Sequence, residues 1–433
     1  MMHKNLGELL KLKKAKIFEA AAILLLAVLL GTLAVAIDGG TQIAAFASAQ
    51  TAAQTTITPT NYPAYVLGSS NISSVINSSL QIGTSNITPI SDVAILSSIK
   101  AGDGVLFVDG QWLQTTSFSI VATEIQPLIL EGIPVIVIAN SPELLKTATA
   151  GFNISQVYPT NVPLIACGLK YYPQTGQSIG LAISGSPTNS SQISKATTGA
   201  YQWSSQFLTN TVPQQMANQV SPMDNAPYWW MGFELYYYSY DEFAPYGELN
   251  FFNQYYILEN SGWPNYNFYS CHYDFESVPG DESFGNNELT EWMANEYEAN
   301  YVTGHSADLL IGASPTSNSG GSQTVSVSLS AEGPALAWQY NIPDVTESWM
   351  GDLSEQMAAW AHQVNIGNCG SAENTFDVNP GWTTQVPSSE KYGSVYDIYE
   401  IGWGHWNWYI PGIWGYWVED YQATVTCYGL IFN

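Results

Sequence analysis

The sequence predicts an α+β multidomain protein, in which an N-terminal α/β doubly wound domain precedes an aromatic-rich antiparallel β-sandwich-like domain. Apolar runs alternate with helix-periodic segments over residues 61–208, a region dense in aromatic side chains spans 209–300, and strands of alternating polarity dominate 301–433. Residues 1–49 form a leader, and residues 50–60 form a linker rich in Thr, Ala and Gln.

Buried strands and helices alternate in the first region. Continuous apolar runs at residues 105–108 and 133–138 are typical of parallel strands that are covered on both faces. Residues 116–131 have the apolar spacing of a helix that Gly132 ends, and Ser141-Pro142-Glu143 begins another helix. Shorter strands are expected at residues 64–67, 93–96 (alternatively the end of a helix), 162–166 and 179–183.

The order of strand, Asp109-Gly110, helix and then EGIPVIVIAN resembles the flavodoxin-like and amidotransferase-like α/β sandwiches in pattern. However, Cys167 lacks the strand-to-helix elbow of the amidotransferase nucleophile. Gly102-Asp103-Gly104 lies before a strand and is therefore unlike a phosphate-binding loop. We expect the sheet to be a scaffold without a cofactor, and Cys167 to be a core thiol.

Aromatic side chains dominate residues 228–269, where 18 of 42 residues are Tyr, Trp or Phe. Neither helical nor strand periodicity is regular here, and the interleaved carboxylates are Glu234, Asp241, Glu242, Glu248 and Glu259. We favour an interdomain core over a surface that binds sugar rings, lipid or a partner. Residues 270–276 are expected to form a strand, and residues 288–298 a short helix.

Alternating polarity predicts the strands of an antiparallel sandwich at residues 325–330, 336–342, 360–366 and 417–427. The segment GWGHWNWYIPGIWGYW is rich in tryptophan and is predicted to form a loop or hairpin around Pro411-Gly412. The ligand-binding residues that we expect, for a saccharide, lipid headgroup or protein, are Trp403, Trp406, Trp408 and Trp414.

The N-terminal residues predict export. Five lysines precede residue 17, residues 20–37 are uncharged and apolar or small, and Ala47-Ser48-Ala49 completes a secretory signal peptide. An uncleaved membrane anchor through residues 20–37 is the alternative, with the N-terminus cytoplasmic and the remainder outside. Lys14-Ala15-Lys16-Ile17-Phe18 also resembles the cleavage site of archaeal prepilin-like leaders.

The charge pattern indicates the surrounding medium. The chain has no arginine, and no lysine lies between Lys195 and Lys391. Nucleic acid is therefore excluded as a partner, because phosphate binding needs clustered Lys and Arg. Charged residues total only 11%, which suits strongly acidic water, where most carboxylates are neutral. We favour a thermoacidophilic archaeal source over an ordinary acidic secreted protein, and an extracellular or cell-surface location.

Covalent modification is predicted at two kinds of residue. The N-x-S/T sequons, which are candidate glycan sites, begin at Asn71, Asn77, Asn86, Asn153 and Asn189. Of the four cysteines, Cys369 and Cys427 are the pair that we expect to form a disulfide.

The sequence contains no clear metal or catalytic constellation. Cys271, His272 and Asp274 could ligate a metal, but no second matching group follows, and we predict no metal. Structural roles are expected for His272, His305, His362 and His405. Glu419-Asp420 in GYWVEDY resembles the EWIVEDF stretch of fungal glutamic peptidases, acid-active β-sandwiches, and these two residues are weak catalytic candidates.

The function expected from these observations is a non-catalytic binding or envelope role in a secreted or membrane-anchored cell-surface protein. The alternative is an extracellular acid-active hydrolase, either a glycosidase or a carboxyl-type peptidase. A filament or surface-layer subunit is the third hypothesis. An enzyme is the less favoured class, because no titratable group stands out as catalytic.

Overall fold

The computed structural model describes residues 62–81, 86–100, 102–139, 142–150, 163–208, 227–299, 308–331, 333–364, 369–388, 396–408 and 420–431. All of them belong to one compact unit, Gln54–Asn433. The predicted leader, the linker, Asn153, His305, Trp414 and Glu419 lie outside the described residues. None of the helices in the described ranges has the length and apolar character needed to cross a membrane.

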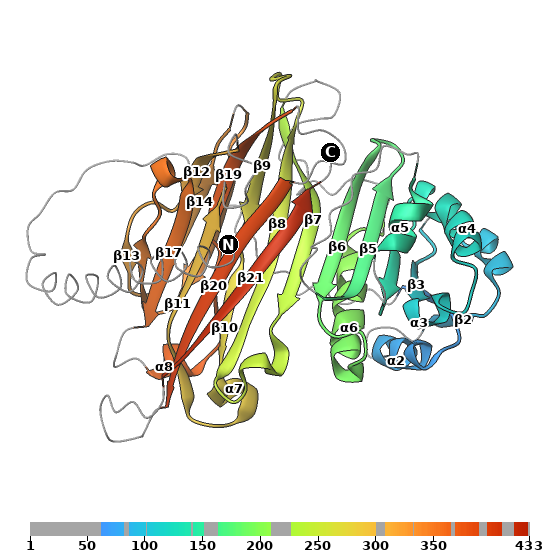
Figure 1. The fold of residues 1–433 in the computed structure, drawn as a ribbon, viewed down its shortest axis with the longest axis horizontal. Helices are drawn as coiled ribbons and strands as arrows, with labels where there is room; N and C mark the ends of the chain where they lie inside the picture. Colours follow the sequence, from blue (N-terminus) through green and yellow to red (C-terminus); the bar gives the residue numbers. More distant parts are fainter. Residues whose placement is uncertain are drawn as a thin grey trace, which may run out of the picture. The chain divides into compact units, whose positions relative to one another are not determined.

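The described strands form three sheets, of 13, six and two strands. We call them the large sheet, the second sheet and the hairpin. The protein is thus a mixed, mostly β structure, and the predicted α+β class is confirmed. The large sheet runs through both the α/β region and the aromatic region, as Figure 1 shows.

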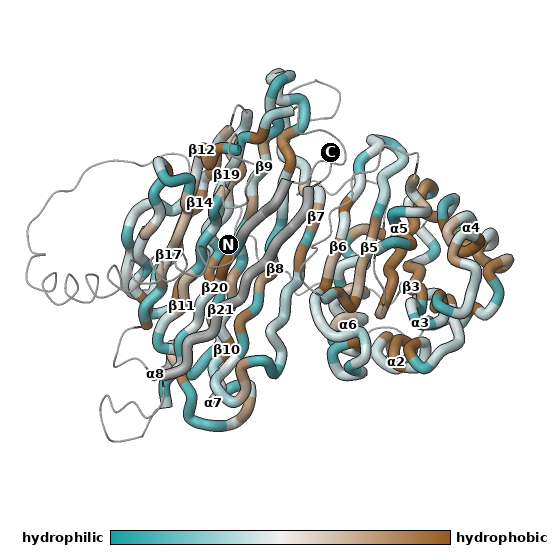
Figure 2. Tube along the Cα trace, viewed as in Figure 1, coloured by the Kyte–Doolittle hydropathy of each residue, from teal (hydrophilic) through white to brown (hydrophobic). Residues whose placement is uncertain are grey.

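Four parallel strands begin the large sheet in the order β2-β1-β3-β4. They are β1 (Ala64–Leu67), β2 (Ile87–Ile90), β3 (Val105–Asp109) and β4 (Val135–Ile138). The helices are α2 (Asn71–Leu80), η1 (Val93–Ser98), α3 (Gly110–Leu113), α4 (Phe118–Leu130), α5 (Glu143–Ala148) and α6 (Ser190–Gln206). Helices α2 and α6 share one core with Val66 and Phe107, whereas α4 and α5 share another with Leu106 and Val108. Alternate strand residues thus bury both faces of the sheet, and Figure 2 shows strong hydrophobic colouring along β3.

The next two strands correct the expectation of a wholly parallel sheet. β5 (Leu164–Tyr172) is antiparallel to β4, and β6 (Gln177–Ser184) is antiparallel to β5. Only residues 173–176 connect β5 to β6, which is too short for the crossover that a parallel pair needs. The strands themselves lie close to the predicted positions.

The aromatic region forms long strands. β7 (Tyr228–Tyr238) pairs with β6 in parallel and with β8 (Gly247–Glu259) in antiparallel orientation. The sheet continues through β9 (Tyr266–His272), β19 (Gly381–Pro387) and β12 (Leu309–Ser314), and β10 (Phe275–Pro279) joins β8 to β18 (Phe376–Val378). Aromatic residues occur on both faces of β7, where Trp229 and Trp230 enter different cores, so regular alternation is lost.

The second sheet has the strand order β13-β16-β17-β11-β20-β21. Its strands are β11 (Glu288–Glu298), β13 (Ser319–Gly320), β16 (Val345–Trp349), β17 (Met357–Val364), β20 (Tyr396–Trp408) and β21 (Asp420–Ile431). The predicted helix at residues 288–298 is therefore wrong. Its Glu, Ala, Met and Leu residues favour a helix, but β17 and β20 pair with it on both edges, and tertiary pairing overrides a weak local propensity.

The second sheet packs face to face on part of the large sheet. The rings of Tyr297 and Trp382 stack with centroids 3.8 Å apart. At Gly402 in β20, an added Cβ would lie 2.6 Å from Phe275 and 2.7 Å from Phe251, so the close approach of the two sheets requires glycine there. Figure 1 shows β20 crossing over β8 and β10.

The hairpin consists of β14 (Gln323–Leu329) and β15 (Leu336–Ile342), which pair only with each other among the described strands. Val325, Val327 and Tyr340 are buried, whereas Ser326 and Gln339 are exposed. The alternation that predicted these two strands therefore separates a buried face from a solvated one.

Candidate functional site

The face of the large sheet opposite the second sheet carries an unusual set of polar and aromatic side chains. Tyr273 and Phe275 belong to the core shared with the second sheet, so His272, Asp274 and Glu276 alternate to the opposite face. We call this surface the acid–aromatic face. Its residues are Glu234, Tyr236, Tyr238, Asn250, Phe252, Gln254, Tyr256, His272, Asp274, Glu276, Asp377 and Asn379.

One half of the acid–aromatic face is a hydrogen-bonded chain. Gln254 Nε2 donates to Glu234 Oε1 over 2.7 Å, and Tyr256 OH donates to Gln254 Oε1 over 3.0 Å. His272 Nδ1 lies 3.3 Å from the same Gln254 oxygen, and Tyr236 OH donates to Glu234 Oε2 over 3.2 Å. Burial raises the pKa of Glu234 to about 7 and lowers the pKa of His272 to about 4. Both side chains are therefore neutral between these two values.

The other half is a cluster of three carboxyl groups. Glu276 and Asp377 are directly opposite in the pairing of β10 and β18, and Asn250 Nδ2 donates to Glu276 Oε1 over 2.8 Å. Burial, with the charges of Asp377 and Glu276, raises the pKa of Asp274 well above its ordinary value. Burial likewise raises the pKa of Glu276 and of Asp377. A carboxyl group with a raised pKa stays neutral to higher pH, and a neutral carboxyl can both donate and accept a hydrogen bond.

Two buried atoms of this face have no protein hydrogen-bond partner in the described part of the chain. They are Nε2 of His272 and Oδ1 of Asp274. Buried polar atoms are nearly always partnered in proteins, so such atoms require an explanation. The two residues are next-but-one neighbours on one face, and both atoms are available to a group that binds there.

Aromatic rings surround the polar groups. Phe252 packs edge-on against Tyr238, with centroids 5.4 Å apart, and His272 lies 4.6 Å from Trp338 of the hairpin. Trp338 is held in place because its Nε1 donates to the carbonyl oxygen of Asn379 over 2.6 Å. Rings beside a few convergent polar groups are typical of ligand sites.

A further buried acid, Glu400, lies between the two sheets and has no solvent exposure. Its Oε2 accepts from Tyr255 OH and Asn253 Nδ2, each over 2.6 Å, and its Oε1 accepts from Trp382 Nε1 over 3.1 Å. Burial raises the pKa of Glu400 to about 7. These donors, and Cys271, which also hydrogen-bonds Glu400, are neutral, so none of them compensates a carboxylate charge as a lysine or arginine would.

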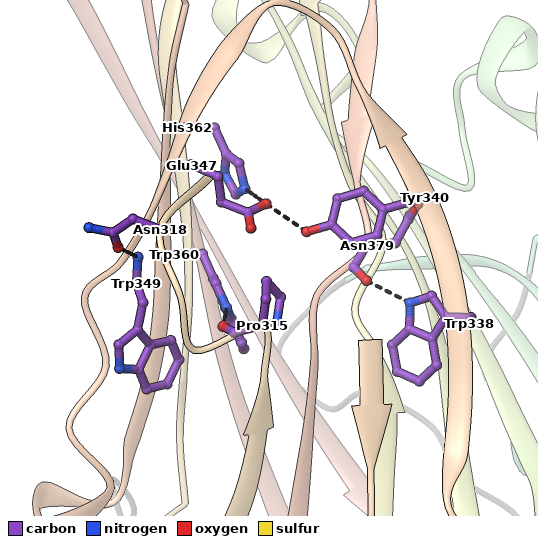
Figure 3. A network of polar contacts seen from close by, with 9 residues as sticks. All are labelled: Pro315, Asn318, Trp338, Tyr340, Glu347, Trp349, Trp360, His362 and Asn379. Atoms are coloured by element: carbon purple, nitrogen blue, oxygen red, sulfur yellow. Dashed lines mark hydrogen bonds and ion pairs between the residues drawn. The ribbon is translucent and has the colours of Figure 1, made fainter. Parts of the chain in front are cut away.

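A third polar network fastens the hairpin to the sheets (Figure 3). Tyr340 OH donates to Glu347 Oε2 over 2.6 Å, and His362 Nε2 lies 3.0 Å from the same oxygen. Glu347 and His362 have no solvent exposure. His362 is thus a buried side chain with a hydrogen-bonded partner, and the network joins the hairpin to β16 and β17.

The α/β region has a polar centre that is already satisfied by the protein itself. Asp109, at the end of β3, accepts from Ser70 Oγ at 2.5 Å and from Ser73 Oγ at 2.6 Å. It also accepts from the backbone N–H groups of Ser70, Gln111 and Trp112. Open α/β sheets bind ligands at the carboxyl ends of their strands. Here the Asp109 carboxyl group already accepts from the N–H and O–H groups that could otherwise bind a ligand, which agrees with a scaffold role.

The three described tryptophans among those predicted to bind a ligand differ in exposure. Trp406 has no solvent exposure and packs against Gly247 and Phe243, so it belongs to the core. Trp403 and Trp408 are half-buried. Of the weak catalytic candidates, Asp420 begins β21 opposite Asn407, and its side chain is not described.

The structure describes the side chains of two of the four cysteines and of four of the five sequon asparagines. Cys167 is a buried free thiol, as expected, and Cys271 is also buried; the side chains of Cys369 and Cys427 are not described. The described sequon asparagines are Asn71, Asn86 and Asn189, which are exposed, and Asn77, which is half-buried. Within the described ranges, no three His, Cys, Asp or Glu side chains are grouped to hold a metal ion.

Sequence reasoning did not identify the acid–aromatic face as a site. The interleaved Glu234 was noted, and His272 and Asp274 were considered only as metal ligands. The available signal was the alternation of His272, Asp274 and Glu276 against Tyr273 and Phe275. Strand pairing then brings Asp377 to the cluster from about a hundred residues away.

No protein-family model matches the chain, and no curated protein matches it. Among solved structures, it is similar to Clostridium perfringens delta-toxin, with a TM-score of 0.30 and 12% identity over 43% of this chain and 88% of that one. It is also similar to a pore forming protein, with a TM-score of 0.25 and 9% identity over 42% of this chain and 84% of that one. Scores this low do not indicate a shared fold, and they assign no activity.

Proposed function

We propose that the protein is a secreted or membrane-anchored cell-surface protein of an acid-adapted organism, with a non-catalytic binding role at the acid–aromatic face. The observation that carries the proposal is the cluster of Asp274, Glu276 and Asp377, whose pKa values are all raised. No lysine or arginine occurs between Lys195 and Lys391 to neutralise them.

Electrostatics connects this cluster to the medium. Two like charges 4 Å apart repel by about 4 kcal/mol at an effective dielectric constant of about 20. With no cation to offset the repulsion, the cluster is most stable when its carboxyl groups are protonated. A solution well below neutral pH supplies those protons. The low content of charged residues, 11%, also fits acidic surroundings.

Location is supported by the leader. Residues 1–49 have the order of a secretory signal peptide, and an uncleaved span at residues 20–37 would leave the N-terminus cytoplasmic.

We retain the predicted domain boundaries at residues 208 and 300, and we propose that residues 61–208 are a doubly wound scaffold. The parallel order β2-β1-β3-β4 supports this description.

The ligand is neutral or cationic on this account, because the face offers neutral carboxyl groups and aromatic rings but no lysine or arginine. Saccharides, lipid headgroups and protein segments all remain in this class, whereas nucleic acid does not. The test is binding of labelled protein, at pH 3, to arrays of saccharides, phosphatidylcholine vesicles and peptides. Binding should be lost in the double variant His272→Ala/Asp274→Asn and retained in Glu143→Gln, which changes an exposed acid.

An acid hydrolase is the second candidate function. It is favoured by the raised pKa of Asp274 beside Asp377, because two neighbouring carboxyls that share a proton can act as acid and base. Hydrolysis of denatured protein or soluble polysaccharide at pH 2–4, abolished in both Asp274→Asn and Asp377→Asn, would establish it. Binding without turnover would leave the non-catalytic role.

A further inference from the structure

The outer face of the second sheet holds a compact polar group at a strand irregularity. The pairing of β11 with β20 shifts register between Thr290 and Trp292, so Glu291 is an extra residue of β11. Bulges of this kind re-aim side chains and are common beside functional sites. Met293 and Tyr297 face the large sheet, and Trp292 therefore lies on the outer face.

Three side chains meet at the bulge. Asn407 Nδ2 donates to Glu291 Oε2 over 2.7 Å, and His405 Nδ1 lies 2.5 Å from the same oxygen. The His405 ring stacks on Trp292 with centroids 5.4 Å apart and an interplanar angle of 14°. The side chains of His405 and Glu291 are 14% and 22% exposed, so the group is reached from solvent.

One hydrogen-bond acceptor of this group has no partner in the described part of the chain. Asn407 is only 2% exposed, and its Oδ1 has no hydrogen-bond partner among the described residues. The Glu291 carboxylate fixes the amide orientation, because it attracts Nδ2 and repels Oδ1. A buried acceptor without a hydrogen bond destabilises the folded protein. A ligand that donates a hydrogen bond to this oxygen would remove that cost, which favours its binding.

We propose that Glu291, Trp292, His405 and Asn407 form a binding site for a neutral carbohydrate. Hydroxyl groups of a sugar would donate to Asn407 Oδ1 and Glu291, while a sugar ring face would pack on the aromatic surface of Trp292. Trp403 lies two residues from His405 and opposite Ala294, and it extends that surface along β20. The site contains the acidic side chain of Glu291 and no lysine or arginine, so an anionic ligand is disfavoured.

The site is separate from the acid–aromatic face, because it lies on a different sheet. Its test uses the whole exported chain with cellohexaose, maltohexaose and mannohexaose, and tryptophan fluorescence and calorimetry at pH 3 and pH 6. At least one hexasaccharide should bind. Trp292→Ala and Asn407→Leu should each weaken binding about tenfold or more, as expected when a stacked ring or a buried hydrogen bond is lost.

Controls separate binding from folding. Trp263→Ala, which removes an exposed tryptophan from the turn between β8 and β9, should leave affinity unchanged. Because Asn407→Leu changes a buried residue, Glu291→Ala is a second variant, and thermal unfolding is recorded for each. Lack of binding to all three sugars by the folded wild type, or unchanged affinity in folded Trp292→Ala and Glu291→Ala, would overturn the proposal.

Discussion

Raising the pH from 4 to 8 should destabilise this protein, and two buried acids dominate the expected change. Glu400 has no solvent exposure and Glu234 has 2%. Their hydrogen-bond donors are Tyr, Trp, Asn, Gln and Cys side chains, which carry no charge. Burial raises each pKa from an ordinary 4.5 to about 7.

The magnitude follows from linkage between protonation and folding. A folded-state pKa above the unfolded value means that the folded protein holds the proton more tightly. The resulting stability is fully present below pH 4.5 and is lost as the pH rises through 7. For each acid the loss is about 3 kcal/mol, and the slope between these values is about 1.4 kcal/mol per pH unit. The two together approach the whole stability of many domains.

His272 opposes this trend over part of the range. Burial lowers its pKa from 6.5 to about 4, so it contributes stability above pH 6.5 that is lost as the pH falls through 4. Its side chain is partly accessible, which reduces its effect. The raised pKa values of Asp274, Glu276 and Asp377 add to the acid preference, so the sum still favours low pH.

Urea unfolding at half-unit steps from pH 3 to pH 8, followed by tryptophan fluorescence, measures this dependence. The free energy of unfolding should be highest near pH 4 and should decline toward pH 8. Glu400→Gln should remove about one proton from the slope, whereas Glu143→Gln, at an exposed position, should leave the slope unchanged. Stability that rises from pH 4 to pH 7 would refute the reasoning.

Three further predictions concern single residues. Tyr340→Phe removes the hydrogen bond to Glu347 and should lower the free energy of unfolding by about 2 kcal/mol, with faster amide exchange in the hairpin; equal exchange would contradict it. Asp109→Ala leaves several donors unpaired and should cost about 3 kcal/mol or more in urea unfolding, and a loss below 1 kcal/mol would argue against a central role. In a glycosylating host, mass spectrometry should find glycan at exposed Asn71 and little at half-buried Asn77; equal occupancy of the two sites would contradict this prediction.

Local pattern predicted much of the fold because burial leaves a periodic signal. Residues 105–108 and 133–138 are covered on both faces, and their continuous apolar runs were sufficient to place β3 and β4. The hairpin strands have one wet face, and strict alternation was sufficient there. Neither inference needs information about distant residues.

The predictions were wrong where residues far apart in the sequence determine the secondary structure or the burial of a side chain. Residues 288–298 have helix-forming composition and become a strand because β17 and β20 offer hydrogen bonds on both sides. The tryptophans of β20 appeared equivalent in sequence. However, alternation places Trp406 in the core and Trp403 partly in solvent, which depends on which face of β20 meets the large sheet.

Taken alone, the sequence determined the mixed class and the positions of the strands with a regular apolar pattern, since composition and periodicity are properties of neighbouring residues. The tertiary structure alone decided which acids lack a compensating charge. Asp377 reaches Glu276 through strand pairing, and Glu400 meets Tyr255 and Trp382 only because two sheets pack together. Proximity of this kind depends on the path of the whole chain, and so no local pattern records it.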